Sequence, residues 1–406
     1  MKILHTSDLH LGKNLYDMPR YDEYQKLLDF IIKTIIDFKI EVLLLCGDIF
    51  DTKTPSHKSQ ELYYNFLTKL NSIKSLDNVV IISGNHDSPS FLDAAKILLK
   101  TLRIHIISNA SDNIQDEVFI LKDKNGKEKL VVGAVPYLRS SDLITSSFTE
   151  DMQSRNNNLR LAIKQHYENI GYECQKASQK FDPPLPIIGT GHLFLGGNTQ
   201  LQNNDDNIYV GSLDLMPASI IPSCFKYTAL GHIHRPQKID NNDYIRYCGS
   251  PLQLSFDEDN SKKFINIVEI TDTTTVTAIE VPVFQKIKSL KGDAKALLDE
   301  VSLLVKNNEN IFLELNYESD SPIGDLYDKV IAITNKSLVK VLALKDRSIK
   351  SQVLRREFKE EDLSALTPYD VFNRLLDTQK IPLEEKYEYI NTFKEIMNLL
   401  NNENDA

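Results

Sequence analysis

The chain has 406 residues, of which 41% are hydrophobic, and this length exceeds what one hydrophobic core usually serves. We therefore expect two or more domains. The formal net charge of -10 argues against a protein coated with basic surface that holds nucleic acid unaided. It does not exclude an enzyme that acts on an anionic substrate, because cations bound in a site would add positive charge that the sequence count omits.

The first 280 residues alternate strand-like and helix-like segments. Apolar residues recur at helical spacing in 24–35 and again in 62–70. Apolar and β-branched runs typical of buried strands lie before, between and after them. The pattern predicts an α/β fold over 1–280, with two sheets forming a sandwich flanked by helices. The strand-like runs are 3–4, 42–45, 79–82, 130–135, 187–188, 227–230, 244–247 and 264–270.

The character of the chain changes in three further segments. A polar helical stretch at 149–180, closed by a proline pair, is expected to form an inserted helical flap. A helix, strand, helix, strand series predicts a small α+β domain over 281–360. The last segment, 361–406, is expected to form two helices, because Thr367 and Pro368 provide an N-cap and a proline at the first helical position.

Cysteine usage and hydropathy indicate a cellular compartment. The four cysteines, at 46, 174, 224 and 248, form no CxxC pair, so we interpret them as reduced core thiols. The N-terminus passes into a strand-like run without a charged region, a long apolar stretch or a cleavage site. No later segment approaches membrane-spanning length. We therefore expect a soluble cytoplasmic protein without a membrane contact.

Acid, amide and imidazole side chains follow five of the predicted strands, each where the strand ends. Because parallel strands deliver their carboxyl ends to one edge of a sheet, we expect these side chains to converge. Carboxylate, amide oxygen and imidazole, without thiolate, suit borderline divalent ions such as manganese, iron or zinc. The set indicates a two-metal site for chemistry on phosphate esters. The five blocks are Asp8-Leu9-His10, Gly47-Asp48, Gly84-Asn85-His86-Asp87, Gly191-His192 and Gly231-His232-Ile233-His234.

Each block alone also has an ordinary structural explanation. Asn and Asp tolerate left-handed backbone in turns, and a His-x-His pair can belong to a core. Against this, Asp8 and His10 are two positions apart, which places both side chains on one side of an extended segment. Glycines before the ligand residues permit sharp turns close to an ion. The conjunction of all five blocks at strand ends favours the metal site.

Together the blocks closely resemble the calcineurin-like metallophosphoesterases, and specifically the SbcD family of bacterial nuclease subunits. The resemblance extends to the small second domain and the terminal segment, so it covers essentially the whole chain. It implies a two-sheet metallophosphoesterase sandwich, a small α+β capping domain that binds DNA, and C-terminal helices. It rests on residues 5–12, 47–51, 84–88, 191–192, 231–234, 249–251 and 363–372.

The family pattern implies a role for each residue of the blocks. His86 would stabilise the transition state and protonate the leaving alkoxide, and Asp87 would orient its imidazole. A bridging water of lowered pKa would supply the attacking hydroxide. The resemblance favours Mn²⁺, with Mg²⁺, Fe²⁺ or Zn²⁺ as alternatives. One ion would be held by Asp8, His10, Asp48 and His234, and the other by Asp48, Asn85, His192 and His232.

Charge and motif details favour a diester substrate. Two dications minus two carboxylates leave about plus two, which a phosphodiester and a hydroxide together neutralise. The arginine that grips phosphate in the family's protein phosphatases is missing, and lysine lacks its bidentate fork. Archaeal and eukaryotic relatives of SbcD have a histidine at the position of Asp51, so we assign Asp51 no role. The candidate phosphate contacts are Lys13, Arg20 and Lys53, with solvated surface charge as the alternative.

An apolar stripe in the terminal segment leads to a second functional hypothesis, which concerns a partner protein. Its residues recur at spacings of three and four, as in an amphipathic helix. The stripe can dock on the protein's own surface, whereas the resemblance favours capture of the coiled-coil base of SbcC, an ABC-type ATPase. No nucleotide is expected to bind this chain, because it has no GxxxxGK[ST] loop. The stripe is Leu366, Val371, Phe372, Leu375, Leu383, Tyr387, Ile390, Phe393, Met397 and Leu400.

These observations predict a manganese-dependent DNA phosphodiesterase, an exonuclease on duplex ends and an endonuclease on single strands and hairpins. SbcC would govern its access to DNA in repair and recombination, and a homodimer is expected from the resemblance. Two alternatives stay open: a metallophosphoesterase acting on another phosphodiester such as a cyclic nucleotide, and a noncatalytic scaffold for the ATPase. The complete site disfavours the scaffold, and the terminal helices disfavour the small-molecule enzyme.

Overall fold

A computed structural model of the chain describes residues 1–143, 152–196, 215–319 and 323–347, and single positions between 372 and 393. The chain divides into two compact units, Met1–Lys286 and Ile287–Ala406. Each unit has a hydrophobic core of its own. The division into three functional parts at residues 280 and 360 stays a prediction.

The first unit contains two mixed six-stranded sheets. In the first sheet β1 to β4 run parallel, and β13 and β14 continue it antiparallel beside β1. Every residue of β2 is buried, as is typical of a parallel strand covered on both faces. The order across the sheet is β14 (Thr274–Glu280), β13 (Phe264–Ile270), β1 (Lys2–Thr6), β2 (Val42–Cys46), β3 (Asn78–Ile82) and β4 (Ile104–Ile107).

The second sheet has the same mixed character. Its strands β12, β10, β7 and β6 run parallel, and β11 and β5 are antiparallel edge strands. A short parallel pair, β8 (Leu195–Gly196) and β9 (Met216–Pro217), stands apart from it. The order is β11 (Gln237–Ile239), β12 (Asn242–Tyr247), β10 (Thr228–Gly231), β7 (Ile187–His192), β6 (Glu128–Gly133) and β5 (Val118–Lys122).

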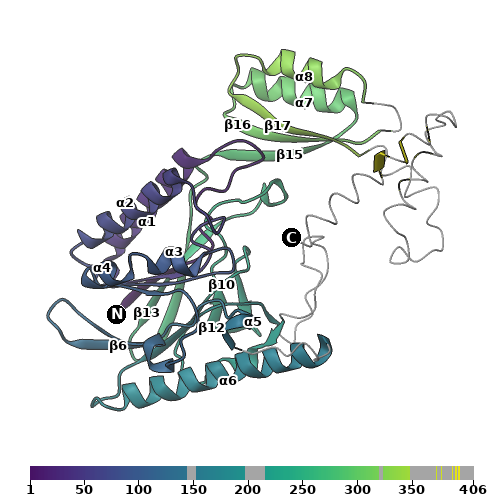
Figure 1. The fold of residues 1–406 in the computed structure, drawn as a ribbon. Helices are drawn as coiled ribbons and strands as arrows, with labels where there is room; N and C mark the ends of the chain where they lie inside the picture. The colour runs from purple at the N-terminus through teal and green to yellow at the C-terminus, as the bar shows by residue number, and fades with distance from the viewer. Residues whose placement is uncertain are drawn as a thin grey trace. The chain divides into compact units, whose positions relative to one another are not determined.

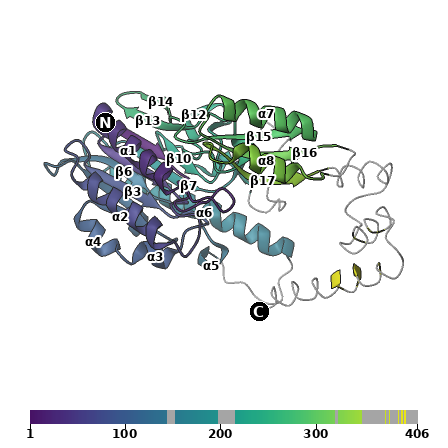
Figure 2. The same ribbon diagram turned by 90° about the horizontal axis from the view of Figure 1, so that it is seen from above.

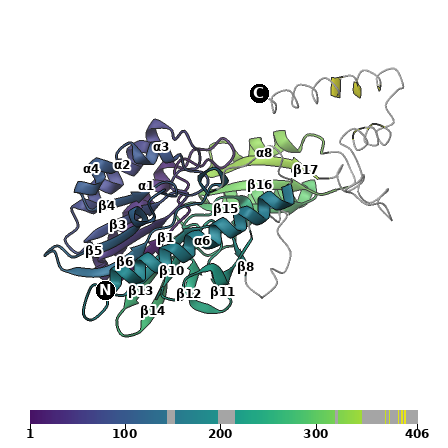
Figure 3. The same cartoon turned by 60° about the horizontal axis from the view of Figure 1, so that its bottom comes forward.

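Three apolar layers hold the first unit together. Helices α1 (Tyr21–Phe38) and α2 (His57–Asn71) pack on the outer face of the first sheet. A second layer, with Leu44 and Val132, lies between the sheets. Helix α6 (Met152–Ser178) covers the outer face of the second sheet, on the side opposite α1 and α2 (Figures 1 and 3). The predicted two-sheet α/β sandwich flanked by helices is confirmed.

Local sequence explains where the main helices of this unit begin and end. Helix α1 ends at Lys39, which adopts a left-handed conformation with φ of 53°. Helix α2 begins after Ser56, whose hydroxyl accepts the N–H of Ser59 at 3.2 Å as an N-cap. The shorter helices are α3 (Pro89–Asp93), α4 (Lys96–Thr101), α5 (Ser140–Leu143) and the 3₁₀ turns Ile114–Glu117, Ala218–Ile220 and Phe256–Glu258.

The helical flap that we predicted at 149–180 is instead a layer of the core. Tyr167, Ile170 and Cys174 of α6 are fully buried against the second sheet. These apolar residues recur at intervals of three and four, so one narrow stripe of an otherwise polar helix faces the sheet. The prediction was wrong because overall polarity was taken as evidence of exposure.

The second unit is a three-stranded sheet with two helices. It contains β15 (Lys286–Gly292), α7 (Ala294–Lys306), β16 (Ile311–Tyr317), α8 (Leu326–Thr334) and β17 (Val339–Asp346). The sheet order is β15, β16, β17, with β16 and β17 parallel. Both helices lie on one face of the sheet, where they bury its apolar side chains (Figures 1 and 2). The predicted series of helices and strands lacked β15.

The cysteines lie in or beside the apolar layers of the first unit. All four cysteines are free, with Cys224 half-buried and the others buried. Cys46 and Cys174 belong to the two apolar layers on either face of the second sheet. Of the helices that the structure describes, none is long and apolar enough to cross a membrane.

Candidate metal centre

The five sequence blocks lie at the carboxyl ends of five strands. Asp8 lies two residues after the end of β1, and Asp48 lies two residues after the end of β2. His192 is the last residue of β7, and His232 directly follows β10. Within each sheet the strands concerned are parallel and adjacent. Because the two sheets are stacked, both sets of strand ends face one shared space.

The backbone of the blocks is unusual for residues with side chains. Asp8, His10, Asp48 and His232 all have positive φ, at 53°, 46°, 48° and 100°. Such conformations cost free energy and persist where the surrounding structure imposes them, often at functional sites. Gly84 allows the backbone to approach Asp48 closely. A Cβ at this position would lie 2.0 Å from Oδ1 of Asp48.

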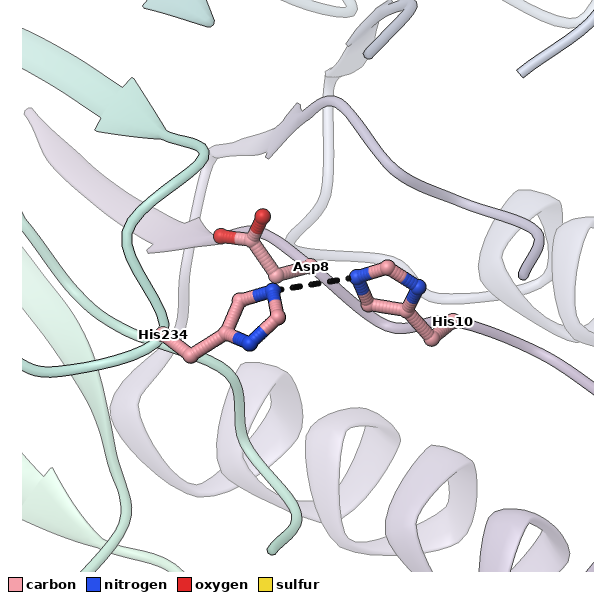
Figure 4. Close-up of side chains that lie close together, drawn as sticks. All are labelled: Asp8, His10 and His234. Carbon is pink, nitrogen blue, oxygen red and sulfur yellow. Dashed lines mark hydrogen bonds between the residues drawn. The ribbon is translucent and has the colours of Figure 1, made fainter. Parts of the chain in front are cut away.

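One group of potential ligands comprises Asp8, His10 and His234. Their ligand atoms all lie within 4.8 Å of one another. Nε2 of His10 is 3.2 Å from Nε2 of His234, and the two rings meet nearly at right angles (Figure 4). Asp8 and His10 are almost fully buried. Two imidazole nitrogens and a carboxylate thus converge on one point, as ligands of a divalent ion do.

A second group comprises Asn85, His192 and His232. Oδ1 of Asn85 is 3.1 Å from Nε2 of His192 and 3.1 Å from Nδ1 of His232. The three side chains come from the first sheet, β7 and the end of β10. An amide oxygen and two imidazoles therefore meet at a second point.

The carboxylate of Asp48 lies between the two groups. Its Oδ2 is 3.5 Å from Nε2 of His10 and 3.4 Å from Nε2 of His192. Burial alone would raise the pKa of Asp48, but the imidazoles, His192 foremost, hold that pKa well below its usual range. Burial raises the pKa of Asp8. Bound cations would keep both acids ionised, so the charge balance of this site favours metal ions.

Hydrogen bonds orient two of the imidazoles toward the centre. Nδ1 of His192 lies 2.9 Å from the carbonyl oxygen of Cys46 and must donate to it, so Nε2 is the nitrogen left to face an ion. Nδ1 of His10 lies 3.1 Å from Oδ1 of Asp51, with the same result. Although burial lowers the pKa of His192, the carboxylates, Asp48 foremost, raise it to about 9, so a bound cation would take the place of the Nε2 proton. Burial lowers the pKa of His232 to about 4 and that of His234 to about 3. Both are therefore neutral at pH 7, the form that binds metal.

The imidazole of His86 also lies within 4.8 Å of ligand atoms of His10 and Asp48. The backbone N–H of His86 donates to Oδ1 of Asp48 at 2.9 Å, and the centre of its ring lies 4.8 Å from that of the His10 ring. Its Nδ1 is 2.8 Å from the carbonyl oxygen of Asp51. We expected Asp87 to orient this imidazole, but the Asp87 carboxylate accepts three backbone N–H groups instead. These are the N–H groups of Gly84 at 2.8 Å, Phe50 at 2.9 Å and Ile49 at 3.1 Å.

Two residues near the centre were not predicted from the sequence. Asp51 contacts both His10 and His86, and its position three residues after Asp48 was the available signal. Arg139 contacts the loop that carries Asn85 and His86. No motif surrounds Arg139, so only the folded chain reveals its place.

The three candidate phosphate contacts differ in their surroundings. Lys13 forms an ion pair of 3.1 Å with Asp51 at the edge of the centre. Lys53 is exposed. Arg20 is 3% exposed, and its guanidinium binds both carboxylate oxygens of Glu23 and the carbonyl oxygen of Gln253. We do not carry Arg20 forward as a phosphate contact, because its donors are used inside the fold.

Three members of the terminal stripe are described. The rings of Phe372 and Phe393 stack at 4.1 Å with an interplanar angle of 8°, and Ile390 is half-buried. The other stripe residues, Leu366, Val371, Leu375, Leu383, Tyr387, Met397 and Leu400, lie outside the described residues.

Comparison with known proteins agrees with this geometry. The family profile described as Calcineurin-like phosphoesterase matches residues 1–236, and the one described as Type 5 capsule protein repressor C-terminal domain matches 283–380. The SbcD subunit of the nuclease SbcCD of Escherichia coli (strain K12) is 32% identical over 411 aligned positions, which cover 100% of both chains. The SbcD of Bacillus subtilis (strain 168) is 32% identical over 274 positions, 66% of each chain. That of Rhodobacter capsulatus is 26% identical over 339, covering 80% of this chain and 82% of the relative.

The two-sheet fold and its converging carboxylate, amide and imidazole groups are those of a calcineurin-like phosphoesterase, a metal-dependent phosphodiester hydrolase. The prediction of this enzyme class is confirmed. The chain belongs to the SbcD family of nuclease subunits.

Proposed function

We propose that the protein hydrolyses DNA phosphodiester bonds with two divalent ions, as an exonuclease on duplex ends and an endonuclease on single strands and hairpins. One observation carries the proposal. An oxygen of Asp48 lies 3.5 Å from His10 and 3.4 Å from His192, between two groups of ligand atoms. A single carboxylate so placed can bridge two ions, which is the arrangement of enzymes that displace an oxygen from phosphorus in line.

Each proposed ligand has a place in this scheme. Bound divalent ions supply Lewis acidity and a water of lowered pKa. We favour Mn²⁺, because imidazole, amide and carboxylate donors without thiolate suit a borderline ion. The first ion would be held by Asp8, His10, Asp48 and His234, and the second by Asp48, Asn85, His192 and His232.

His86 is the proposed general acid. The carbonyl oxygen of Asp51 accepts its Nδ1–H at 2.8 Å, so Nε2 is the atom that can hand a proton to the leaving alkoxide. Asp87 fixes the loop that presents this imidazole through its three backbone bonds. Lys13 and Lys53, near the first two blocks, are the proposed contacts for flanking phosphates.

The capping domain over 281–360, which contains the three-stranded sheet of the second unit, is proposed to bind DNA. Cationic side chains gather on the sheet face opposite α7 and α8. Nζ of Lys340 lies 5.8 Å from the centre of the Phe312 ring, Lys345 pairs with Glu314 at 2.7 Å, and Nε of Arg347 donates to Asn316 at 2.8 Å. Cations beside an aromatic ring suit a nucleic-acid backbone, even in a chain of net negative charge.

The proposed partner is SbcC, an ABC-type ATPase, in a cytoplasmic complex. The relatives are named as one kind of subunit of a nuclease called SbcCD, which supports a complex of two kinds of subunit. The terminal segment 361–406 would bind the coiled-coil base of SbcC. A homodimer within a heterotetramer is part of the proposal. Ile97 and Leu98 of α4, 88% and 67% exposed, offer adjacent apolar surface for contact between copies.

The function is tested with purified protein, end-labelled hairpin DNA and bis(p-nitrophenyl) phosphate. Each substrate is incubated with manganese, with magnesium or with a chelator. We expect manganese-dependent cleavage of both substrates and none with the chelator. Cleavage of the small diester without DNA cleavage would favour a small-molecule phosphodiesterase. Absence of cleavage with either substrate would favour the scaffold.

A further inference from the structure

The loop Gly84–Asp87 carries two of the proposed functional groups, Asn85 and His86. Its two ends are held by one guanidinium. An Nη of Arg139 donates to the carbonyl oxygen of Gly84 at 3.1 Å and to that of Asp87 at 3.0 Å. The other Nη lies 3.4 Å from the carbonyl oxygen of Ser108. The planar guanidinium fork of an arginine can reach three carbonyl oxygens on two loops in this way, and the single ammonium of a lysine cannot.

Arg139 comes from a different sheet than the loop it holds. The loop follows β3 of the first sheet, and Ser108 follows β4. Arg139 lies just before α5, in the segment that follows β6 of the second sheet. Its guanidinium stands 5.6 Å from the ring centre of Tyr137, and that ring lies 6.2 Å from the ring of His192. The arginine thus links the second-sheet side of the centre to the first-sheet side.

The loop is therefore held from two directions. The carboxylate of Asp87 accepts the N–H of Gly84 within the loop, and Arg139 binds the carbonyls of the same two residues. Between them, Oδ1 of Asn85 must stay about 3.1 Å from two imidazoles. A displacement of about 1 Å at such a site can cost a hundredfold in rate.

We propose that Arg139 is a positioning residue, which sets Asn85 and His86 relative to His192 and does not bind substrate. The inference rests on the proposed two-ion function. It predicts that loss of the fork weakens the metal site of Asn85 and leaves the site of Asp8, His10 and His234 unchanged. It also predicts a fall in kcat without a rise in KM.

The experiment compares Arg139→Lys, Arg139→Gln and Arg139→Ala with Arg246→Ala. Arg246 is the matched control, because its guanidinium also binds a backbone carbonyl, that of Asp243, at 2.8 Å on β12. Manganese binding is measured by titration calorimetry on the full chain. All Arg139 variants should lose about tenfold in affinity at one of two sites. Arg246→Ala should match the wild-type protein at both.

Kinetics with bis(p-nitrophenyl) phosphate separate positioning from substrate binding. At saturating manganese, kcat of Arg139→Lys should fall about tenfold to a hundredfold, with KM within about twofold of wild type. Added guanidinium chloride, but not ammonium chloride, should restore part of the activity of Arg139→Ala. The Arg139→Lys variant keeps the charge and much of the volume, so it tests the fork even where Arg139→Ala fails to fold.

Three results would overturn the inference. A raised KM with unchanged kcat would make Arg139 a phosphate contact. Wild-type manganese binding and kcat in Arg139→Lys would show that the fork is dispensable. Equal weakening of both metal sites, or the same losses in Arg246→Ala, would indicate a general effect on the fold. If the wild-type protein cleaves neither substrate, the proposed function fails, and the calorimetry still decides the positioning role.

Discussion

Oδ1 of Asp51 lies 3.1 Å from Nδ1 of His10, and this contact fixes which nitrogen of His10 faces the metal centre. The carboxylate also pairs with Nζ of Lys13 at 3.1 Å. Imidazole ligands commonly donate their second N–H to a carboxylate, which orients the ring and raises its basicity. Asp51, which the sequence left without a role, is therefore a functional candidate.

The change Asp51→Asn should lower manganese affinity by about tenfold to a hundredfold, because the amide is a weaker acceptor for the His10 N–H. The loss should fall on the site of Asp8, His10 and His234, the opposite selectivity to that expected for Arg139. Titration calorimetry checks it. Asp29→Asn, which removes an exposed ion pair with Lys69, is the control. Equal affinities in wild type and Asp51→Asn would remove the orienting role.

The change Asp48→Asn should reduce both metal stoichiometry and cleavage, because its carboxylate lies between the two ligand groups. Asp8→Asn should weaken the site of His10 and His234 more than the other, because Asp8 groups with both of these histidines but with only His192 of the other site's histidines. Metal content after dialysis, measured by mass spectrometry alongside diester cleavage, distinguishes the two variants. Full metal content in Asp48→Asn would contradict the bridging position.

The change His86→Ala should leave metal binding intact and lower kcat by about a hundredfold to ten-thousandfold, the contribution of a general acid. Its imidazole is held by the Asp51 carbonyl at 2.8 Å and is not among the proposed ligands. Single-turnover cleavage of hairpin DNA and metal analysis are measured on the same sample. The control is His57→Ala, an exposed histidine at the start of α2. Wild-type cleavage by His86→Ala would eliminate the proposed acid.

The contribution of His5 to the free energy of unfolding should decrease as the pH falls. Its ring is fully buried, 2.8 Å from the hydroxyl of Tyr227 and 3.2 Å from the carbonyl oxygen of Leu230, and burial lowers its pKa to about 3. A pKa lower in the folded than in the unfolded state stabilises the fold above pH 6.5, and this stabilisation is lost as the pH falls toward 3. Between pH 7 and pH 5 this contribution should decrease by about 2 kcal/mol.

Urea unfolding with a chelator, at pH 7 and pH 5, measures that difference. The variant His5→Gln cannot titrate, so its free energy of unfolding should change less with pH than that of wild type. His57→Gln, which removes an exposed histidine, should follow wild type. The same pH dependence in His5→Gln and wild type would assign the effect to other groups.

Deletion of the residues after Ser364 should abolish association with SbcC and leave manganese-dependent cleavage of the small diester unchanged. The deleted part contains the apolar stripe, and the metal centre lies wholly within residues 8–234. Co-purification with SbcC checks the first part, and the chromogenic assay checks the second. Retained association would place the partner site elsewhere. Loss of cleavage would point to a fold that needs the terminal segment.

Much of the centre was predictable from local patterns. Strand ends are marked by apolar runs, and the residue types after β1, β2, β3, β7 and β10 indicate their chemistry. Parallel pairing then brings these ends to one edge whatever the details of packing. For this reason local sequence was enough to place Asp8, Asp48 and His192 correctly at strand ends.

What lies between the blocks was decided only by tertiary packing. Whether Arg20 faces solvent or Glu23, and whether α6 is a flap or a layer, depends on contacts with segments distant in sequence. The same holds for Asp51 and Arg139, whose partners become neighbours only in the folded chain. Local sequence determined the proposed ligands and the strands that present them. The stacked sheets decided which side chains orient those ligands, because hydrogen bonds form between groups that folding, and not the order of the chain, brings together.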